Sequence, residues 1–411
     1  MTQVLVIGYV WPEPNSSAAG SHMMSLLRFF RAQNWQVEFA SPAQQTEHMA
    51  DLSQEQITCT PITLNCSSFD DYITQLRPNI VMFDRFMMEE QFGWRVDKFA
   101  PDALKILDTE DLQCLRNARH DAHKAQQAFA LDNLLDSDLA KREIAAILRC
   151  DLSLIISDYE HQLLTSQFGV SEDLLHHLPF MVDLDAISHD VPDYHARQHF
   201  MTIGNFRHAP NWDAVLYLQQ IWPMIRKQLP DAQLHIYGSY PPPKATALHN
   251  PKTGFLIKGW AKDALNVMAQ SRVCLAPLRF GAGIKGKLLE AMITQTPCVT
   301  TQIGAEGMHG ELPWHGAISD CAEAFAAEAI DLYQNEARYH QAQQYGRALL
   351  QARYNKRTLE VQLKQKISEI LTNLTAHRRA NFTGSMLRHH TLRSTQYMSQ
   401  WIEAKNANKM R

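Results

Sequence analysis

A short glycine-rich segment with two lysines is the part of this chain whose residue types most clearly suggest chemistry. It runs from Gly281 to Ala291 and reads Gly-Ala-Gly-Ile-Lys-Gly-Lys-Leu-Leu-Glu-Ala, between a strand-like run, Val273–Leu278, and a helix-like continuation. A glycine loop that opens a helix presents backbone N–H groups and the positive end of the helix dipole to an anion. Lys285 and Lys287 add charges suited to phosphate oxygens, and Glu290 can accept hydrogen bonds from a sugar diol. The segment therefore predicts a site for a sugar attached to phosphate.

Two other interpretations of this segment stay open. Gly281, Gly283 and Gly286 also have the spacing of the dinucleotide fingerprint, and Glu306 follows where that fingerprint expects an acidic residue. This match would indicate a nicotinamide-dependent oxidoreductase, although such loops normally open a domain and carry few charges. The structural alternative is a plain glycine turn with solvated lysines and a Glu290 that faces water.

A second polar group follows an apolar run in the first half of the chain. The residues Asp108-Thr109-Glu110-Asp111 come directly after Lys105–Leu107. Carboxylates this close repel one another, so we expect them to bind hydroxyl groups of a substrate or to pair with Arg116 or Arg119. The alternative is an acidic helix start, with Asp108 or Thr109 as the N-cap and the next two acids in the first turn.

The elements that must position these residues alternate between short apolar runs and longer helical patterns. This alternation is typical of α/β layers with a mainly parallel sheet. In the first half, the expected strands are Val4–Gly8, Val37–Ala40, Ile80–Phe83, Lys105–Leu107 and Ser153–Ser157, and the expected helices are Ser21–Gln33, Ala122–Asp136 and Asp138–Arg149. The polar stretch Leu184–Arg197 is expected to be a linker. A second α/β series begins at Phe200, and two such halves would leave a cleft at the carboxyl ends of both sheets.

Composition narrows the class of protein. The 411 residues are enough for two domains with full cores, and a formal net charge of −4 indicates neither a bulk nucleic-acid binder nor a disordered chain. The seven cysteines are scattered and form no C-x-x-C pair, so a disulfide framework or a cysteine metal site is not expected. The chain runs from Met1 into an apolar strand without a basic leader, and no apolar run approaches the length of a membrane span. We expect a cytoplasmic protein.

Three stretches together resemble retaining glycosyltransferases of family four, which have the GT-B fold. They are the segment from Cys274 to Gly307 around the glycine loop, Gly204-Asn-Phe-Arg-His-Ala-Pro-Asn-Trp-Asp-Ala214, and the opening Pro14-Asn-Ser-Ser-Ala-Ala-Gly-Ser-His22. The resemblance covers about residues 1 to 375 and is more specific in the second half. It implies an α/β architecture of two Rossmann-like, doubly wound domains facing a cleft, with a C-terminal helical extension. The expected parts are an N-terminal acceptor domain (1–190), a nucleotide-sugar domain (198–345), a C-terminal helix packing back toward the N-terminal domain (346–376) and a basic tail (377–411).

The resemblance also implies an activity. The chain would move a sugar, with retention at the anomeric carbon, from a nucleoside-diphosphate sugar to a hydroxyl of a glycan or lipid-linked acceptor, in glycan or envelope polysaccharide synthesis. Neither a cofactor nor a metal is expected, because GT-B enzymes generally do not need one. A non-catalytic sugar-binding protein on the same fold is the alternative from another class, and the nicotinamide-dependent oxidoreductase is the less favoured one.

The resemblance assigns roles to particular residues. Glu290 occupies the second glutamate of the Glu-x7-Glu motif, which binds the ribose hydroxyls, whereas Ala282 stands at the first glutamate. Asn205 and Pro210 stand where the family often has an arginine and a lysine, so the cationic role would pass to Arg207 and the two loop lysines. The expected donor-binding residues are Gly20, Ser21, Asn205, Arg207, Trp260, Gly283, Ile284, Lys285, Lys287 and Glu290, and the expected catalytic residues are Glu110 and Asp111.

Three of these assignments rest on local patterns. A helix starting after Gly20 could offer N–H groups, including that of Ser21, to the β-phosphate. Trp260 follows a strand end and could stack on the nucleobase, with a core tryptophan as the equal alternative.

The tail has an unusual composition. No acidic residue occurs from His377 to Ile402, and Tyr397 and Trp401 are spaced i, i+4, so that a short helix could bury one apolar stripe. We expect the tail to dock on the N-terminal domain, with peripheral contact to the inner membrane face as the second alternative and disorder as the third.

Overall fold

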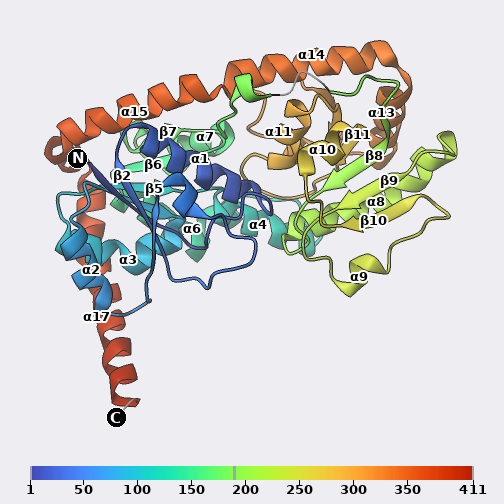
Figure 1. The fold of residues 1–411 in the computed structure, drawn as a ribbon. Helices are drawn as coiled ribbons and strands as arrows, with labels where there is room; N and C mark the ends of the chain where they lie inside the picture. The colour runs from blue at the N-terminus through green and yellow to red at the C-terminus, as the bar shows by residue number, and fades with distance from the viewer. Residues whose placement is uncertain (1, 188–190, 410–411) are drawn as a thin grey trace.

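A computed structural model describes residues 2–187 and 191–409, which form two α/β domains side by side (Figure 1). Within these residues, the first domain has a seven-stranded parallel sheet of order β3-β2-β1-β4-β5-β6-β7, and the second has a six-stranded parallel sheet of order β10-β9-β8-β11-β12-β13. In each sheet the chain starts in the middle and winds outward in both directions. The prediction of two doubly wound domains is confirmed.

The strands are short and mostly buried. Those of the first sheet are β1 (Gln3–Ile7), β2 (Gln36–Ser41), β3 (Thr58–Pro61), β4 (Ile80–Asp84), β5 (Leu104–Asp108), β6 (Leu152–Ile155) and β7 (Leu175–His177). Those of the second are β8 (Gln198–Ile203), β9 (Leu234–Tyr237), β10 (Phe255–Gly259), β11 (Ser271–Ala276), β12 (Cys298–Thr300) and β13 (Gly316–Ile318).

Helices cover both faces of each sheet. In the first domain they are α1 (Ala18–Ala32), α2 (Ser68–Leu76), α3 (Phe86–Phe99), α4 (Gln113–Lys124), α5 (Leu131–Leu135), α6 (Asp138–Arg149) and α7 (Asp158–Ser166). In the second they are α8 (Ala209–Gln228), α9 (Pro243–Thr246), α10 (Ala264–Ala269), α11 (Gly286–Ile293), α12 (Gln302–Ala305), α13 (Ala322–Gln334) and α14 (Glu336–Arg353). The chain closes with α15 (Lys356–Thr372), α16 (Leu374–Ala380) and α17 (Phe382–Lys409).

The strand β4 shows why an apolar run is needed where helices cover both faces. Its side chains alternate between the two faces, so Val81 and Phe83 enter one hydrophobic cluster while Ile80 and Met82 enter the other. All five of its residues are buried. Its one polar side chain, that of Asp84, lies at the carboxyl end of the strand.

One expected helix is wrong. The stretch from Ala122 to Asp136 is not continuous, because α4 ends at Lys124 and α5 begins only at Leu131. Gln126 has a left-handed φ of 55°, and its N–H bonds to the carbonyl of His123, which closes the helix. Of the expected linker, residues 188–190 lie outside the described residues, as do Met1 and residues 410–411 of the expected end segments.

The chain passes from one domain to the other twice, and the two connecting segments are hydrogen-bonded to each other. The Val182 N–H donates to the carbonyl of Tyr354 at 2.8 Å, and the Lys356 N–H donates to the carbonyl of Val182 at 3.0 Å. After this point α15 runs over the first domain (Figure 1), where Leu363 and Ile367 are fully buried against the cluster that contains β1. The expected helix boundary at residue 346 falls inside α14.

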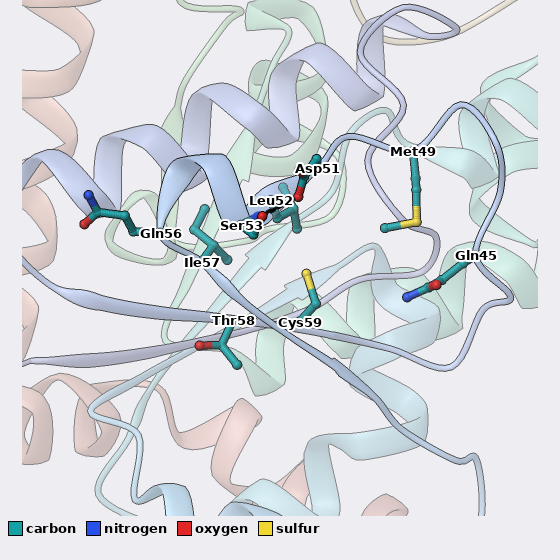
Figure 2. Close-up of a pocket in the computed structure, with 9 residues that line it drawn as sticks. All are labelled: Gln45, Met49, Asp51, Leu52, Ser53, Gln56, Ile57, Thr58 and Cys59. Atoms are coloured by element: carbon teal, nitrogen blue, oxygen red, sulfur yellow. Dashed lines mark hydrogen bonds between the residues drawn. The ribbon is translucent and has the colours of Figure 1, made fainter.

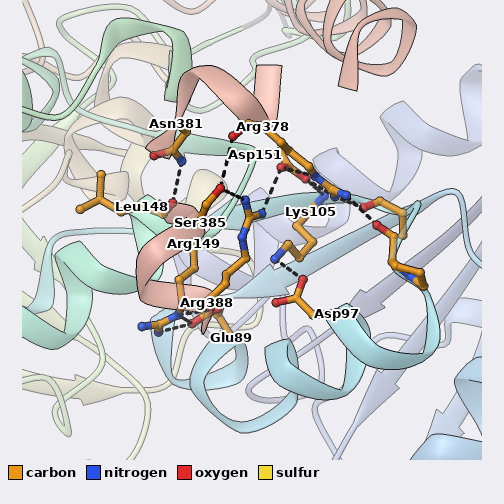
Figure 3. A network of polar contacts seen from close by, with 12 residues as sticks. Glu89, Asp97, Lys105, Leu148, Arg149, Asp151, Arg378, Asn381, Ser385 and Arg388 are labelled. Atoms are coloured by element: carbon orange, nitrogen blue, oxygen red, sulfur yellow. Dashed lines mark hydrogen bonds and ion pairs between the residues drawn. The ribbon is translucent and has the colours of Figure 1, made fainter. Parts of the chain in front are cut away.

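The tail docks on the first domain through α16 and α17, and α17 packs against α3 and α6. Figure 3 shows the polar network that holds it. The Arg378 guanidinium donates to both carboxylate oxygens of Asp151 at 2.8 and 2.7 Å, and the Asn381 amide donates to the carbonyl of Leu148 at 2.7 Å. A Cβ at Gly384 would lie 2.0 Å from the same carbonyl, so only glycine permits this approach.

The apolar stripe of the tail points outward, contrary to expectation. Tyr397, Met398 and Trp401 are each more than half exposed on α17, which is a long helix rather than a short one. None of the helices in the described part of the chain has both the length and the apolar character needed to cross a membrane.

Candidate active site

The glycine loop lies between β11 and α11 and contacts the first domain directly. Gly283 has a left-handed φ of 63°, and a Cβ there would lie 2.8 Å from the Cβ of Asp111 and 3.0 Å from Ile156. A Cβ at Gly286 would lie 2.3 Å from the Cβ of Ala18 at the start of α1. The glycines thus allow the loop of the second domain to touch the carboxyl edge of the first sheet.

The polar groups of the loop have protein partners. The Gly283 N–H donates to the Glu160 carboxylate at 2.6 Å, Lys285 Nζ donates to the Gly283 carbonyl at 2.6 Å, and Lys287 Nζ donates to Asn211 Oδ1 at 2.8 Å. Lys285 is the N-cap residue of α11, without a side-chain cap, and Ile284 beside it is buried. Burial lowers the pKa of Lys285 and of Lys287 to about 8. A phosphate binding here would exchange these internal partners for its own oxygens.

Glu290 lies one turn into α11, as expected, and is half-buried. Burial raises its pKa to about 7, and the charge of Lys287 opposes this shift. No hydrogen bond of the Glu290 carboxylate is seen among the described residues, so it is free to accept from a ligand. Ala282, at the place of the first motif glutamate, packs into a hydrophobic cluster of the first domain.

The acid loop, residues 108–111, faces the glycine loop from the end of β5. Glu110 is buried with a left-handed φ of 59°, and burial followed by the charge of Asp108 raises its pKa to about 8. Asp111 forms an ion pair with Arg116. Thr109 Oγ donates to the Leu154 carbonyl at 2.9 Å.

The N-cap interpretation of the acid loop is wrong. α4 begins at Gln113 with Leu112 as its N-cap, and no residue of the acid loop caps it. Glu143 of α6 accepts instead from the N–H groups of Gln113 and Cys114, at 3.0 and 2.8 Å. The carboxylates of the acid loop are therefore not used to cap α4, and the loop lies at the boundary between the domains.

The roles expected for Gly20 and Ser21 are not supported. α1 begins at Ala18 rather than after Gly20, and the N–H groups of both residues already bond to Ser17. Gly20 is needed for space, because a Cβ there would lie 2.4 Å from the carbonyl oxygen of Glu13.

The remaining expected donor residues follow the strands β8 and β10 of the second domain. Asn205 Oδ1 accepts from the Arg207 N–H at 2.8 Å, and the carbonyl of Asn205 accepts from Asn211, which in turn bonds to Lys287. The Arg207 guanidinium lies 3.7 Å from the centre of the Tyr240 ring. Trp260 is 46% exposed and stacks at 5.7 Å on His48 of the first domain, so the core alternative for this tryptophan is wrong.

Arg119, which was expected to pair with the acid loop if Arg116 did not, and Glu160, which was not assigned, join the domains at this place; Arg116 pairs with Asp111, while Arg119 bonds across the domain boundary. Arg119 donates to both oxygens of Glu306, at 2.7 and 2.9 Å, and to the Gly281 carbonyl at 2.9 Å. Glu160 bonds to Gly283 and, at 3.3 Å, to the Leu112 N–H, while its other oxygen is buried without a partner. Burial, and then the charge of Asp111, raise the pKa of Glu160 to about 8. Glu160 lies in the first turn of α7, the helix that follows β6, and this place after a strand was the available signal.

A separate hollow does not belong to this site. Figure 2 shows it beside β3 at the edge of the first sheet, with a volume of about 620 Å³. None of the expected donor-binding or catalytic residues lines it; its walls come from Gln45, Met49, Asp51, Leu52, Ser53, Gln56, Ile57, Thr58 and Cys59.

Comparison with known proteins gives a family match for the second domain and structural matches for the fold of nearly the whole chain. Residues 197–335 match the family model described as glycosyl transferases group 1. No curated protein sequence matches the chain significantly. The matched domain contains the glycine loop, which leaves the oxidoreductase interpretation without support.

Solved structures match nearly the whole chain. Sucrose-phosphate synthase from Thermosynechococcus elongatus is 15% identical, over 90% of this chain and 100% of that chain, with a TM-score of 0.64. HepE from Anabaena, in complex with UDP and glucose, is 12% identical over 90% and 100%, with a TM-score of 0.66. TarM from S. aureus, in complex with fondaparinux, α-GlcNAc-glycerol and UDP, is 10% identical over 90% and 100%, with a TM-score of 0.67.

At these identities the structural likeness establishes the GT-B fold. The group 1 domain on this fold bears out the expected enzyme class, which is a glycosyltransferase. The predicted family four and the stereochemistry of transfer go beyond these findings.

Proposed function

We propose that this protein is a retaining glycosyltransferase of family four. It would transfer a sugar from a nucleoside-diphosphate sugar to a hydroxyl of a glycan or lipid-linked acceptor, in glycan or envelope polysaccharide synthesis. The observation that carries the proposal is the contact of Gly283 with Asp111, because it places the phosphate-type loop of one domain against the acid loop of the other. A donor on one side and an acceptor on the other would meet there.

Each part of the site has a role in such a transfer. The N-terminus of α11 with Lys285 and Lys287 would neutralise the departing diphosphate, and Glu290 would hold the ribose hydroxyls. Trp260 and its aromatic neighbours suit the nucleobase. Glu110 and Asp111 would bind the acceptor hydroxyl. In this proposal the diphosphate needs no metal and no organic cofactor, and the reaction needs no covalent nucleophile from the protein.

Binding and product analysis test the proposal. We would measure thermal shifts with UDP-, GDP-, dTDP- and ADP-sugars, starting with UDP because two similar structures hold it. The stabilising donor would then be used with glycan acceptors, and NMR of the product from an α-linked donor should show an α linkage. The absence of any stabilising donor would overturn the proposal, and a β product would overturn only the retention.

A non-catalytic sugar-binding protein is the second candidate. Ala282 favours it, since the carboxylate expected at this place is missing and the side chain packs into the first domain. Slow hydrolysis of the donor without acceptor separates the two candidates, because only a catalyst releases the sugar. We further propose that the protein works in the cytoplasm, with peripheral contact to the inner membrane face through α17.

A further inference from the structure

Three carboxylates meet at the carboxyl edge of the first sheet, beside the acid loop. Asp84 ends β4 and Asp108 ends β5, and the two are paired in register; Glu110 follows two residues later. One oxygen from each of the three lies within 4.8 Å of the other two. All three residues are buried, with relative exposures of 4%, 0% and 7%.

These carboxylates have few partners. Neither oxygen of Asp108 has a hydrogen-bond partner, and Asp84 uses only one oxygen, which accepts from the Tyr9 N–H at 2.9 Å. Burying a carboxylate without partners is strongly unfavourable, so such an arrangement indicates a ligand that supplies the missing contacts.

A buried histidine gives an independent indication. His22 on α1 is 2% exposed, and neither of its ring nitrogens has a hydrogen-bond partner. Its Nε2 lies 3.6 Å from Asp108 Oδ1, which is too long for a hydrogen bond. The imidazole therefore points at the carboxylates without being satisfied by them.

A guanidinium also lies beside these carboxylates. Arg85 Nε is 3.6 Å from Asp84 Oδ1. Arg85 and Glu110 both have left-handed φ values, 69° and 59°, at the ends of neighbouring strands. Strained backbone of this kind is concentrated at ligand sites.

We propose that Asp84, Asp108 and Glu110 bind a divalent metal ion, with His22 packed beside Asp108 and outside the ligand set. Carboxylate oxygens suit Mn²⁺ and Mg²⁺. The resemblance led us to expect no metal, and this site is separate from the diphosphate groups at α11. It does not rest on the proposed sugar transfer.

Metal binding to the full chain tests the site directly. After treatment with EDTA, Mn²⁺ would be titrated and followed by electron paramagnetic resonance and by the melting temperature, with Zn²⁺ and Mg²⁺ in parallel. We expect one bound Mn²⁺, a higher melting temperature, and binding weakened more than about tenfold in Asp108→Asn. Asp71→Asn removes an exposed carboxylate of the same domain and should bind Mn²⁺ like the unaltered protein.

The alternative is that His22 is charged and simply pairs with Asp108. In that case Asp108→Asn would lower the melting temperature in EDTA, and no metal would have an effect. If the metal proposal is right, Asp108→Asn removes repulsion among the three carboxylates. This variant should then be at least as stable in EDTA as the unaltered protein. If Asp108→Asn does not fold, Glu110→Gln tests the same ligand set. Absence of Mn²⁺ and Mg²⁺ binding, or equal binding by these variants, overturns the proposal.

Discussion

Three ionisable side chains at the start of α11 have pKa values that burial moves toward neutrality. Those of Lys285 and Lys287 fall to about 8, and that of Glu290 rises to about 7. Their charges therefore change over a range in which a surface lysine stays charged and a surface glutamate stays ionised. The affinity for a donor should therefore depend on pH over the same range.

We expect affinity for a nucleoside diphosphate to follow a bell-shaped pH profile with flanks near 7 and 8. Below the lower flank Glu290 is protonated and loses acceptor strength, and above the upper flank the lysines lose their positive charge. Calorimetric titrations from about pH 6 to about pH 9 measure both flanks. The free nucleoside has no phosphate for the lysines to bind, so its profile should lack the upper flank. The double variant Lys285→Arg with Lys287→Arg should also lack the upper flank for the diphosphate, because arginine stays charged. A flat profile for the diphosphate would contradict the assignment.

Glu290→Ala tests the ribose contact by itself. We expect donor binding to weaken by roughly 1.5–3 kcal/mol, or about ten- to a hundredfold, because hydrogen bonds to a charged group are lost. Inorganic pyrophosphate, which has no ribose, should bind the variant and the unaltered protein alike. Unchanged donor affinity in a folded variant would remove Glu290 from the site.

Sequence reasoning found the loops of the site but not the residues that join them. Lys287 and Glu290 follow a glycine pattern that is local in the chain. Arg119 and Glu160 act on partners 187 and 123 residues away, so no short motif contains both members of either pair. Contacts of this kind depend on how two domains meet, which the spacing of residues along the chain does not encode.

At the scale of elements, strands were more predictable than helix ends. A parallel strand buried on both faces needs a near-continuous apolar run, as β4 shows. The break between α4 and α5 depends on the conformation of one residue, Gln126, and glutamine gives no sequence signal for it. The docking of the tail on the first domain was expected, but the way it docks was not, because Arg378 and Asn381 hold the tail while the aromatic residues of α17 face outward.

Arg378 should contribute most to the docking of the tail. Burial alone would raise the pKa of Asp151, but hydrogen bonds from Arg378 hold it below its usual value. Arg378→Ala leaves this buried carboxylate with fewer partners and should lower the free energy of unfolding by roughly 3 kcal/mol in urea titrations. Arg379→Ala removes the same charge from an exposed position and should have little effect. Equal effects of the two variants would mean that charge, rather than the contact with Asp151, is what matters.

The outward stripe on α17 should control contact with membranes. Replacing both Tyr397 and Trp401 with Ser should reduce sedimentation with anionic vesicles, since apolar and aromatic groups drive insertion at the interface. The melting temperature should stay unchanged, because both side chains are already exposed in the docked helix. Equal partitioning of variant and unaltered protein would refute a membrane role for this stripe.

At the scale of the whole molecule, the two domains are held closely together around the site. A Cβ at Gly307 would lie 2.0 Å from the Ser157 hydroxyl, so this glycine, like Gly283, permits close approach. Arg119 adds a two-pronged ion pair to Glu306 across the same boundary. Residues 281–285 of the glycine loop are buried at this boundary, so we expect these contacts to loosen when a donor binds.

Arg119→Ala should therefore shift the molecule toward a more open form. We expect a larger radius of gyration in small-angle X-ray scattering, because a nearly buried guanidinium no longer bridges the domains. Lys124→Ala, an exposed position on the same helix, is the matched control. Indistinguishable scattering from both variants would show that the Arg119 pair is not what keeps the domains together.

The paired crossings at Val182 and Tyr354 determine what kind of opening this can be. Two domains joined by a single connecting segment can rotate about that segment relative to each other. Here two connecting segments form one parallel bridge and are hydrogen-bonded to each other through both the N–H and the carbonyl of Val182. Torsion about their long axis would break those bonds, whereas flexing across the pair would not. We therefore expect the domains to flex rather than twist about this pairing, which would bring the glycine loop and the acid loop back into a similar register on closing.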